Sequence, residues 1–189
     1  MLSNIRGIWR RLRAHFWASL AFDVALIAAV FFTVHAWQTR DLPLDEAAPA
    51  TALPLLGGGG LQPAVGQGRA GIVYFFAPWC GVCRASIGNL DDLVADGRVD
   101  WATVVALDYA DEAEVAAFIE RTGVTLPVLM GDRGTAGDWS IRGFPTYYVI
   151  DAEGRIDSRS VGYSTTLGMW FRAWKASLMP WRDGADGPR

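Results

Sequence analysis

Two kinds of hydrophobic pattern divide this sequence of 189 residues. One long apolar run fills residues 16–37, and shorter apolar runs alternate with amphipathic stretches between residues 71 and 180. An unbroken run of that length is typical of a membrane helix, whereas short runs interleaved with amphipathic stretches are typical of a sheet covered by helices. The pattern predicts an N-terminal transmembrane helix followed by an α/β domain.

The predicted domain, residues 71–180, follows the order β-α-β-α-β-β-α. Strands are predicted at 71–77, 101–107, 126–130, 146–150 and 155–161, and helices at 80–96, 111–121, 134–141 and 165–178. Interleaved strands and helices predict a parallel-rich sheet, and the turn at 151–154 adds an antiparallel hairpin. The apolar side chains of the last helix share one face, which we expect to be mostly core: Leu167, Trp170, Phe171, Trp174 and Leu178.

The long apolar run carries further signs of a membrane anchor. From Trp17 to Trp37 a helix rises about 30 Å, the thickness of the hydrocarbon core, and tryptophans mark both ends. Four arginines lie in the preceding segment, so residues 1–15 are predicted to be a cytoplasmic tail and the domain to be periplasmic, anchored in the inner membrane by residues 16–37. The alternative is a signal peptide cleaved near Val34-His35-Ala36, although the run is longer than a signal core.

Two segments lie outside the anchor and the domain. Residues 38–70 are rich in proline and glycine and are predicted to be a tether that holds the domain near the membrane. Within it, residues 51–56 and 61–65 can pair as a short hairpin around Gly57–Gly60. Residues 181–189 are predicted to be a polar tail.

Composition narrows the function classes. The net charge of −3 argues against a nucleic-acid partner. The only histidines, His15 and His35, precede the domain, and the chain has two cysteines, so the domain lacks the ligands of a zinc site. We expect neither a bound metal nor a cofactor.

Candidate redox chemistry follows the first predicted strand. Cys80-Gly-Val-Cys83 opens a helix, where free backbone N–H groups stabilise a thiolate. Cys80 is therefore the predicted nucleophile, and Cys83, one turn later, is the predicted resolving thiol. A purely structural disulfide remains the alternative, although so small a loop would stabilise the fold little.

A second segment, Arg142-Gly-Phe-Pro-Thr146, precedes the last hairpin. Pro145 is by itself an ordinary strand starter with a trans bond. If the Phe144–Pro145 bond is cis, the backbone of Phe144 turns outward and can pair with an extended substrate segment. We therefore include Phe144, Pro145 and Thr146 as candidate substrate-binding residues. Trp79, beside Cys80, is a further candidate for substrate binding; the alternative is that its ring packs at the edge of the core.

With these two motifs, residues 70–180 resemble the thioredoxin superfamily. The resemblance rests on Phe76-Ala-Pro-Trp-Cys-Gly-Val-Cys83 and on Gly143-Phe-Pro-Thr146. The anchor and the domain resemble membrane-anchored TlpA-like oxidoreductases, most closely the suppressor-of-copper-sensitivity D-type branch, through the Cys-x-Val-Cys-Arg motif and the tail from Val161 to Trp174. The resemblance implies a thioredoxin fold, a mixed central sheet flanked by helices, with a cis Pro145 beside the dithiol and Cys80 as nucleophile.

The sequence departs from that family at three positions. Tyr74 stands where thioredoxins carry a buried aspartate, Ser86 where cytochrome-maturation relatives often carry a glutamate, and Gly88 where a helix-kinking proline is usual. The familiar proton acceptor for the resolving thiol is thus missing. Asp108 or a water molecule is a candidate replacement.

These observations predict a periplasm-facing thiol-disulfide oxidoreductase. We expect it to reduce disulfides in exported proteins with electrons from an integral-membrane thiol reductant, because an oxidising compartment gives a local reductant most use. The alternatives are a disulfide-donating oxidase, a copper-tolerance module that binds Cu(I) through both thiolates, and an interaction protein with a redox-inactive fold.

Overall fold

The structure is a computed structural model that describes residues 2–178, with side chains from Trp17 onward. The predicted polar tail, 181–189, and the side chains of the predicted cytoplasmic tail, 1–15, lie outside the described residues. The chain forms two compact units, Met1–Arg40 and Asp41–Arg189.

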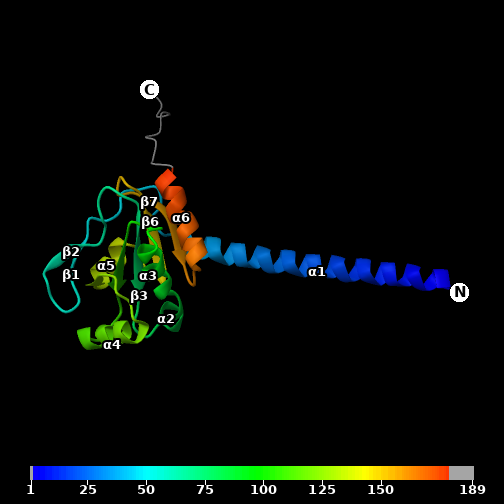
Figure 1. Cartoon of the computed structure of the whole chain (residues 1–189), viewed down its shortest axis with the longest axis horizontal. Coiled ribbons are helices and arrows are strands. Elements are labelled where there is room, and N and C mark those ends of the chain that lie inside the picture. The colour runs from blue at the N-terminus through cyan, green and yellow to red at the C-terminus, as the bar shows by residue number, and fades with distance from the viewer. Residues whose placement is uncertain (1, 179–189) are drawn as a thin grey trace, which may run out of the picture. The chain divides into compact units, whose positions relative to one another are not determined.

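The first unit is a single helix, α1 (Leu2–Thr39), drawn in blue in Figure 1. Its segment Trp17–Thr39 is 23 residues long and is apolar and long enough to cross a membrane. Large apolar side chains along it, such as Phe22, Ile27 and Phe32, are exposed. Exposure of this kind is what a helix surrounded by lipid requires.

The second unit contains two sheets and five helices within the described residues. In chain order the elements are β1 (Ala52–Pro54), β2 (Leu61–Pro63), β3 (Gly71–Phe76), α2 (Gly81–Ser86), α3 (Gly88–Ala95), β4 (Trp101–Ala106), α4 (Glu112–Thr122), β5 (Val128–Met130), α5 (Arg133–Asp138), β6 (Thr146–Ile150), β7 (Ile156–Val161) and α6 (Thr166–Leu178).

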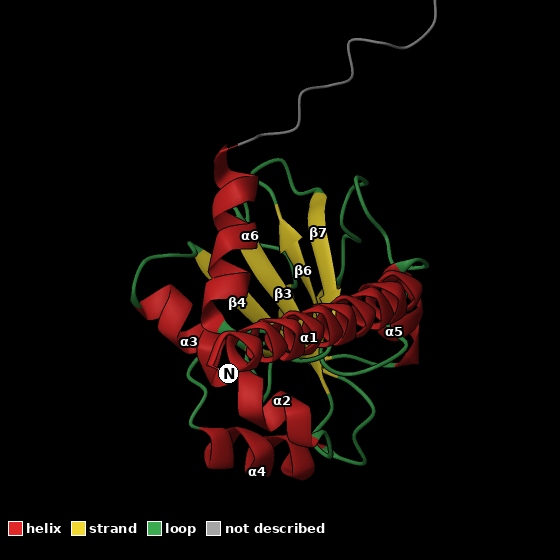
Figure 2. Ribbon diagram, turned by 90° about the vertical axis from the view of Figure 1, so that its right-hand side faces the viewer, coloured by secondary structure: helices red, strands yellow, loops and turns green. Residues whose placement is uncertain are grey.

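The main sheet has the strand order β5-β4-β3-β6-β7. β3 pairs in parallel with β4, which pairs in parallel with β5, whereas β3 pairs antiparallel with β6 and β6 with β7. The predicted mixed sheet flanked by helices is confirmed: α5 lies on one side of the strands and α3 and α6 on the other (Figure 1), and Figure 2 looks onto the sheet from the side of α6. β3 is central, and all six of its residues are buried, because helices or loops cover both of its faces.

Alternate residues of β3 enter two different hydrophobic clusters. Ile72, Tyr74 and Phe76 pack in the cluster that contains the buried residues of α2, α3, α4 and α6. Val73 and Phe75 pack in the cluster on the other face, which includes the fully buried Trp139 after α5. This division follows from the two-residue period of a strand.

The structure corrects the predicted tether. Leu42, Leu53 and Ala64 are buried in the second cluster, so residues 41–65 cover one face of the sheet. The predicted hairpin forms as β1 and β2, with Leu53 paired to Gln62. The folded unit therefore begins at Asp41 rather than at residue 71, because this segment supplies part of the apolar cover over Val73 and Phe75.

Most helix limits agree with the sequence pattern to within a residue or two. Asp111 caps α4 by accepting the Glu114 N–H, and Gly123 ends it with φ 70°, as its cap residues predict. The helix predicted over 80–96 is instead two helices that meet at Ile87. Ser86 donates its hydroxyl to the carbonyl oxygen of Val82, a contact that often bends helices.

The predicted core face of α6 is wrong. Leu167, Phe171, Trp174 and Leu178 are exposed, and only Trp170 of that set is partly buried against the core. The buried residues are the slimmer Met169, Ala173 and Ala176. Small side chains let the helix axis lie close to the sheet, and the hydrophobic pattern alone could not distinguish the two apolar faces.

Candidate active site

The two cysteines lie where β3 gives way to α2. Cys80 is the residue before the first turn of α2, with φ −78° and ψ 107°, and its Sγ accepts the backbone N–H of Cys83 at 3.1 Å. The two residues form a disulfide with a Cα–Cα distance of 5.2 Å. A donor aimed at Sγ stabilises negative charge there when the bond is reduced.

The cysteines differ in accessibility. Cys80 keeps 5% of its surface exposed, whereas Cys83 is fully buried in the core cluster. The exposed surface of the pair therefore belongs to Cys80. Exposure and the N–H donor both distinguish Cys80 from Cys83.

The predicted proline segment lies at the same end of the sheet. The Phe144–Pro145 peptide bond is cis, as the family resemblance implied. Thr146, the first residue of β6, pairs with Phe75 of β3, five residues before Cys80. The Thr146 hydroxyl is buried and donates to the carbonyl oxygen of Gly143 at 2.8 Å, which ties the loop before Pro145 to the strand.

Trp79 connects the cysteine segment with the proline segment. Its side chain is 60% exposed, which favours a surface role over packing at the edge of the core. Its ring meets the ring of Phe144 edge-on, with centroids 5.8 Å apart. Its indole N–H donates to both the carbonyl oxygen and the carboxylate of Asp108, each at 3.1 Å.

Asp108 has a position that sequence reasoning missed. It follows β4 and adopts φ 50°, a left-handed conformation that is uncommon outside glycine. Its carboxylate accepts the indole N–H of Trp79, and its role as proton acceptor for Cys83 stays a prediction. Only the strand order brings Asp108 beside Trp79, since nothing in the local sequence connects residues 29 positions apart.

A cavity of about 510 Å³ adjoins this group. Among its lining residues are Asp108, Tyr109, Asp132, Arg133 and Phe144. Burial, together with the charges of Asp132 and Glu112, raises the pKa of Tyr109, so this hydroxyl remains protonated and can donate a hydrogen bond. The cavity thus offers polar groups of both signs next to the Trp79–Phe144 pair.

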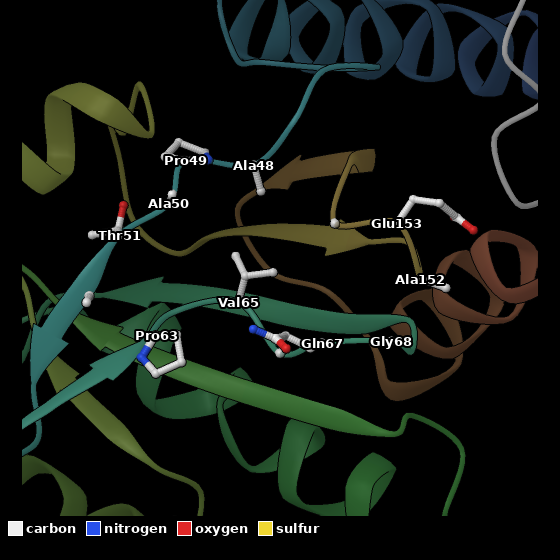
Figure 3. A pocket seen from close by; sticks show the side chains of 13 residues that line it. Ala48, Pro49, Ala50, Thr51, Pro63, Val65, Gln67, Gly68, Ala152 and Glu153 are labelled. Atoms are coloured by element: carbon white, nitrogen blue, oxygen red, sulfur yellow. The ribbon is translucent and has the colours of Figure 1, made fainter.

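A second, smaller groove lies at the opposite end of the sheet, beside the β6–β7 turn. Its volume is about 390 Å³. Figure 3 shows Pro63, Val65 and Gln67 on one wall and Ala48 and Pro49 on the other. The walls are largely small and apolar, and they bring no cysteine to the groove.

Two of the three atypical positions, Tyr74 and Ser86, contact each other. The Tyr74 hydroxyl lies 2.8 Å from the Ser86 hydroxyl, and both side chains are fully buried. Ser86 donates its own hydrogen to Val82, so Tyr74 is the donor of the shared bond. Burial raises the pKa of Tyr74, and this pair is uncharged at neutral pH.

Buried acids are scarce among the described residues 17–178. There, Asp151 is the one buried carboxylic acid, and it accepts backbone N–H groups of Glu153 and Arg155 in the β6–β7 turn. Over the same residues, no group of three or more His, Cys, Asp or Glu side chains could hold a metal ion.

Comparison with known proteins agrees with this geometry. Residues 44–159, more than half of the chain, match the AhpC/TSA family. The chain belongs to the AhpC/TSA family. Its relatives include thiol:disulfide interchange protein HelX of Rhodobacter capsulatus, 33% identical over 147 residues that cover 72% of this chain and 80% of HelX. Thiol:disulfide interchange protein CycY of Rhizobium leguminosarum is 32% identical over 130 residues, covering 67% and 66% of the two chains.

The fold of this AhpC/TSA-family protein matches solved structures as well. A thiol:disulfide interchange protein of the thioredoxin family from Chlorobium tepidum TLS superposes with a TM-score of 0.62 at 23% identity, over 71% of this chain and 97% of the other. The predicted thioredoxin fold is confirmed. Family membership, interchange-protein relatives and the cysteine pair make this protein a thiol-disulfide oxidoreductase.

Proposed function

We propose that this protein is a membrane-anchored, periplasm-facing oxidoreductase that reduces disulfides in exported proteins through Cys80 and Cys83. The observation that carries the proposal is the asymmetry of the pair. Cys80 keeps some exposed surface and its Sγ accepts the Cys83 N–H, whereas Cys83, one turn later, is fully buried. One sulfur is placed to meet a partner and the other to release it.

The reaction proceeds by two exchanges. The Cys80 thiolate attacks one sulfur of a partner disulfide, forming a mixed disulfide and releasing the partner's other sulfur as a thiolate. The thiolate of Cys83, after losing its proton to solvent, then attacks Cys80 Sγ. The Cys80–Cys83 disulfide forms, the partner leaves as a dithiol, and two electrons have passed to it.

Substrate contacts are proposed for the surface beside Cys80. The exposed Trp79 meets the partly buried Phe144 edge-on, and Pro145 and Thr146 fix the backbone that carries Phe144. An extended segment of the partner can lie along this backbone in the manner of an added strand. We propose these four residues as the substrate-binding set.

The location is supported by α1 and by the charges in the sequence. The apolar segment Trp17–Thr39 has the length of a membrane span, and four arginines precede it. Under the positive-inside rule, this arrangement leaves the N-terminus in the cytoplasm and the domain in the periplasm. A membrane-impermeant maleimide applied to reduced, intact spheroplasts should label Cys80, and failure to label it without permeabilisation would contradict this orientation.

The direction of electron flow is tested by the reduction potential of the Cys80–Cys83 pair. A reductase supplied by an integral-membrane thiol reductant should have a potential near the value of about −270 mV found for thioredoxin. A value near about −120 mV would make the protein a disulfide donor instead. Equilibration of the full chain with glutathione, read by alkylation and mass, gives the value.

We also propose the finer placement in the copper-tolerance branch, on the Cys-x-Val-Cys-Arg motif and the tail from Val161 to Trp174. A strain lacking this gene should grow poorly on copper. Wild-type protein should restore growth, and Cys80→Ser should not. Equal growth of the deletion and parent strains on copper would remove the protein from that branch.

A further inference from the structure

Helix α6 has two apolar faces on opposite sides. Met169, Ala173 and Ala176 are buried against the sheet. A second row is offset from them by two residues, which is about 200° around a helix. This row, called here the aromatic stripe, consists of Leu167, Phe171, Trp174 and Leu178.

The aromatic stripe is open to its surroundings. Its four side chains are 65%, 55%, 44% and 57% exposed in chain order. Its rings also pack on one another: the Trp174 ring centroid lies 5.8 Å from that of Phe171, and 6.1 Å from that of Trp170 at the border of the stripe. Four large apolar side chains aligned outward over three turns are unusual on a surface that faces only water.

Polar contacts fix the rotation of α6 that exposes the stripe. Arg172 donates to the Tyr147 hydroxyl at 3.0 Å, and its guanidinium lies 5.8 Å from the centre of that ring. Lys175 forms an ion pair of 3.8 Å with Asp157 of β7. These contacts lie on one flank of the helix, so the stripe's outward direction is built into the fold.

The chain enters the second unit close to α6. The N–H of Asp45 donates to the carbonyl oxygen of Ile156 at 2.9 Å, one residue from the Asp157 that Lys175 contacts. Only Arg40 separates the last residue of α1, Thr39, from the start of this unit. From Thr39 to the buried Leu42, three residues can span at most about 11 Å.

We propose that the aromatic stripe of α6 lies in the lipid–water interface of the bilayer that α1 crosses. The proposal rests on the membrane anchoring proposed above. So short a connection keeps the second unit at the membrane surface, and tryptophan, phenylalanine and leucine on one face of a helix are the side chains that enter this interface. The stripe thus orients the dithiol with respect to the membrane.

The experiment measures contact between Trp174 and lipid in the full chain. The protein is incorporated into phosphatidylcholine nanodiscs, with plain lipid or with lipid brominated on the upper acyl carbons, which quenches nearby tryptophans. Subtracting the emission of Trp174→Phe from that of the wild type isolates Trp174. Interfacial insertion predicts about a twofold loss of this difference emission in brominated lipid.

Matched variants separate the stripe from the rest of the surface. Leu167→Ser combined with Phe171→Ser should abolish the quenching of Trp174, and both changes are at exposed positions that leave the core intact. Leu61→Ser, at an equally exposed leucine of β2, should leave it unchanged. Trp101 packs against the cluster on the other face of the sheet. Subtracting the emission of Trp101→Phe from that of the wild type isolates Trp101, and this difference emission should be the same in plain and brominated lipid.

The outcomes distinguish this inference from the proposed function. A chain that co-elutes with the nanodiscs but shows an unquenched Trp174 overturns the inference and leaves the anchoring intact. That outcome includes a stripe covered by a second copy or by another protein, because either would shield Trp174 from lipid. A chain that does not stay with the nanodiscs overturns both the anchoring and the inference.

Discussion

The hydroxyl of Tyr74 on β3 donates a hydrogen bond to the hydroxyl of Ser86 on α2, with 2.8 Å between the two oxygens. Ser86 lies one helical turn after Cys83. Both side chains are fully buried in the domain core. Two of the three positions at which the sequence departs from the family pattern are therefore partners in one contact. An uncharged hydroxyl pair here means that the proton of Cys83 leaves without help from a buried carboxylate at these positions.

Tyr74→Phe should change the alkaline stability of the protein. Burial raises the pKa of Tyr74 above its ordinary value of about 10, so its contribution to stability is complete below pH 10 and is lost as the pH rises further. A buried tyrosine with a raised pKa lowers the free energy of unfolding by up to about 1.4 kcal/mol for each pH unit above 10. Tyr74→Phe should remove the part of this loss that Tyr74 causes. Urea unfolding between pH 8 and about pH 11 measures this.

Tyr163→Phe is the control for that experiment, because Tyr163 is exposed on the surface before α6. It should leave the alkaline slope at its wild-type value. At neutral pH, Tyr74→Phe should cost about 1 kcal/mol for the lost hydrogen bond. An alkaline slope unchanged by Tyr74→Phe would show that Tyr74 ionises alike in the folded and unfolded chains.

Serine substitutions at the two cysteines should have different effects. Cys83→Ser leaves the accessible Cys80 to attack but removes the thiol that releases the partner, so a mixed disulfide should accumulate. Cys80→Ser should form none. Both variants should reduce a model disulfide protein no faster than background. Non-reducing electrophoresis and mass spectrometry identify the adduct, and an adduct formed by Cys80→Ser would reverse the assigned roles.

Gly71→Ala should destabilise the domain. Its Cβ would lie 2.1 Å from the Trp101 ring on the neighbouring strand, a distance that forces the ring or the strand to move. We expect a loss of about 1–3 kcal/mol in the free energy of unfolding. Gly137→Ala in α5 meets no atom within 4 Å and should be neutral or stabilising. If the clash is the cause, Gly71→Ala should cost little further stability when it is made in a Trp101→Leu background, where the ring is absent.

Lys175→Met should destabilise the protein at neutral pH but not in acid. Burial raises the pKa of Asp157, and the Lys175 ammonium opposes this rise. Without Lys175, the pKa of Asp157 in the folded protein rises further. The variant should therefore keep the stability of the wild type below pH 4, near the ordinary pKa of about 4 for an aspartate, and lose stability as the pH rises through the folded pKa of Asp157. We expect a loss of up to about 1 kcal/mol at pH 7.

Thermal unfolding across pH 3.5 to about pH 8 tests this, with Lys175→Arg as the variant that keeps the charge. The difference between the wild type and Lys175→Met should shrink as the pH falls. A difference that is the same at both ends of the range would mean that packing of the lysine stem, and not its charge, supports α6.

Local patterns in the sequence determined most elements of this protein. The buried run of β3, the caps Asp111 and Gly123, and the Cys80–Cys83 pair at a helix start depend on residues that are neighbours along the chain. Steric and hydrogen-bonding preferences that act over one or two turns suffice to place them. The apolar length of the Trp17–Thr39 segment is a property of the sequence in the same way.

The tertiary structure decided which surfaces meet. Periodicity showed that α6 is apolar but not which face lies inward, because that choice depends on how closely the helix axis can approach β6 and on the polar contacts of Arg172. The packing of Leu42 against the sheet and the contact between Trp79 and Asp108 likewise join segments that are far apart in sequence. Such contacts follow from strand order and register, which no local preference specifies.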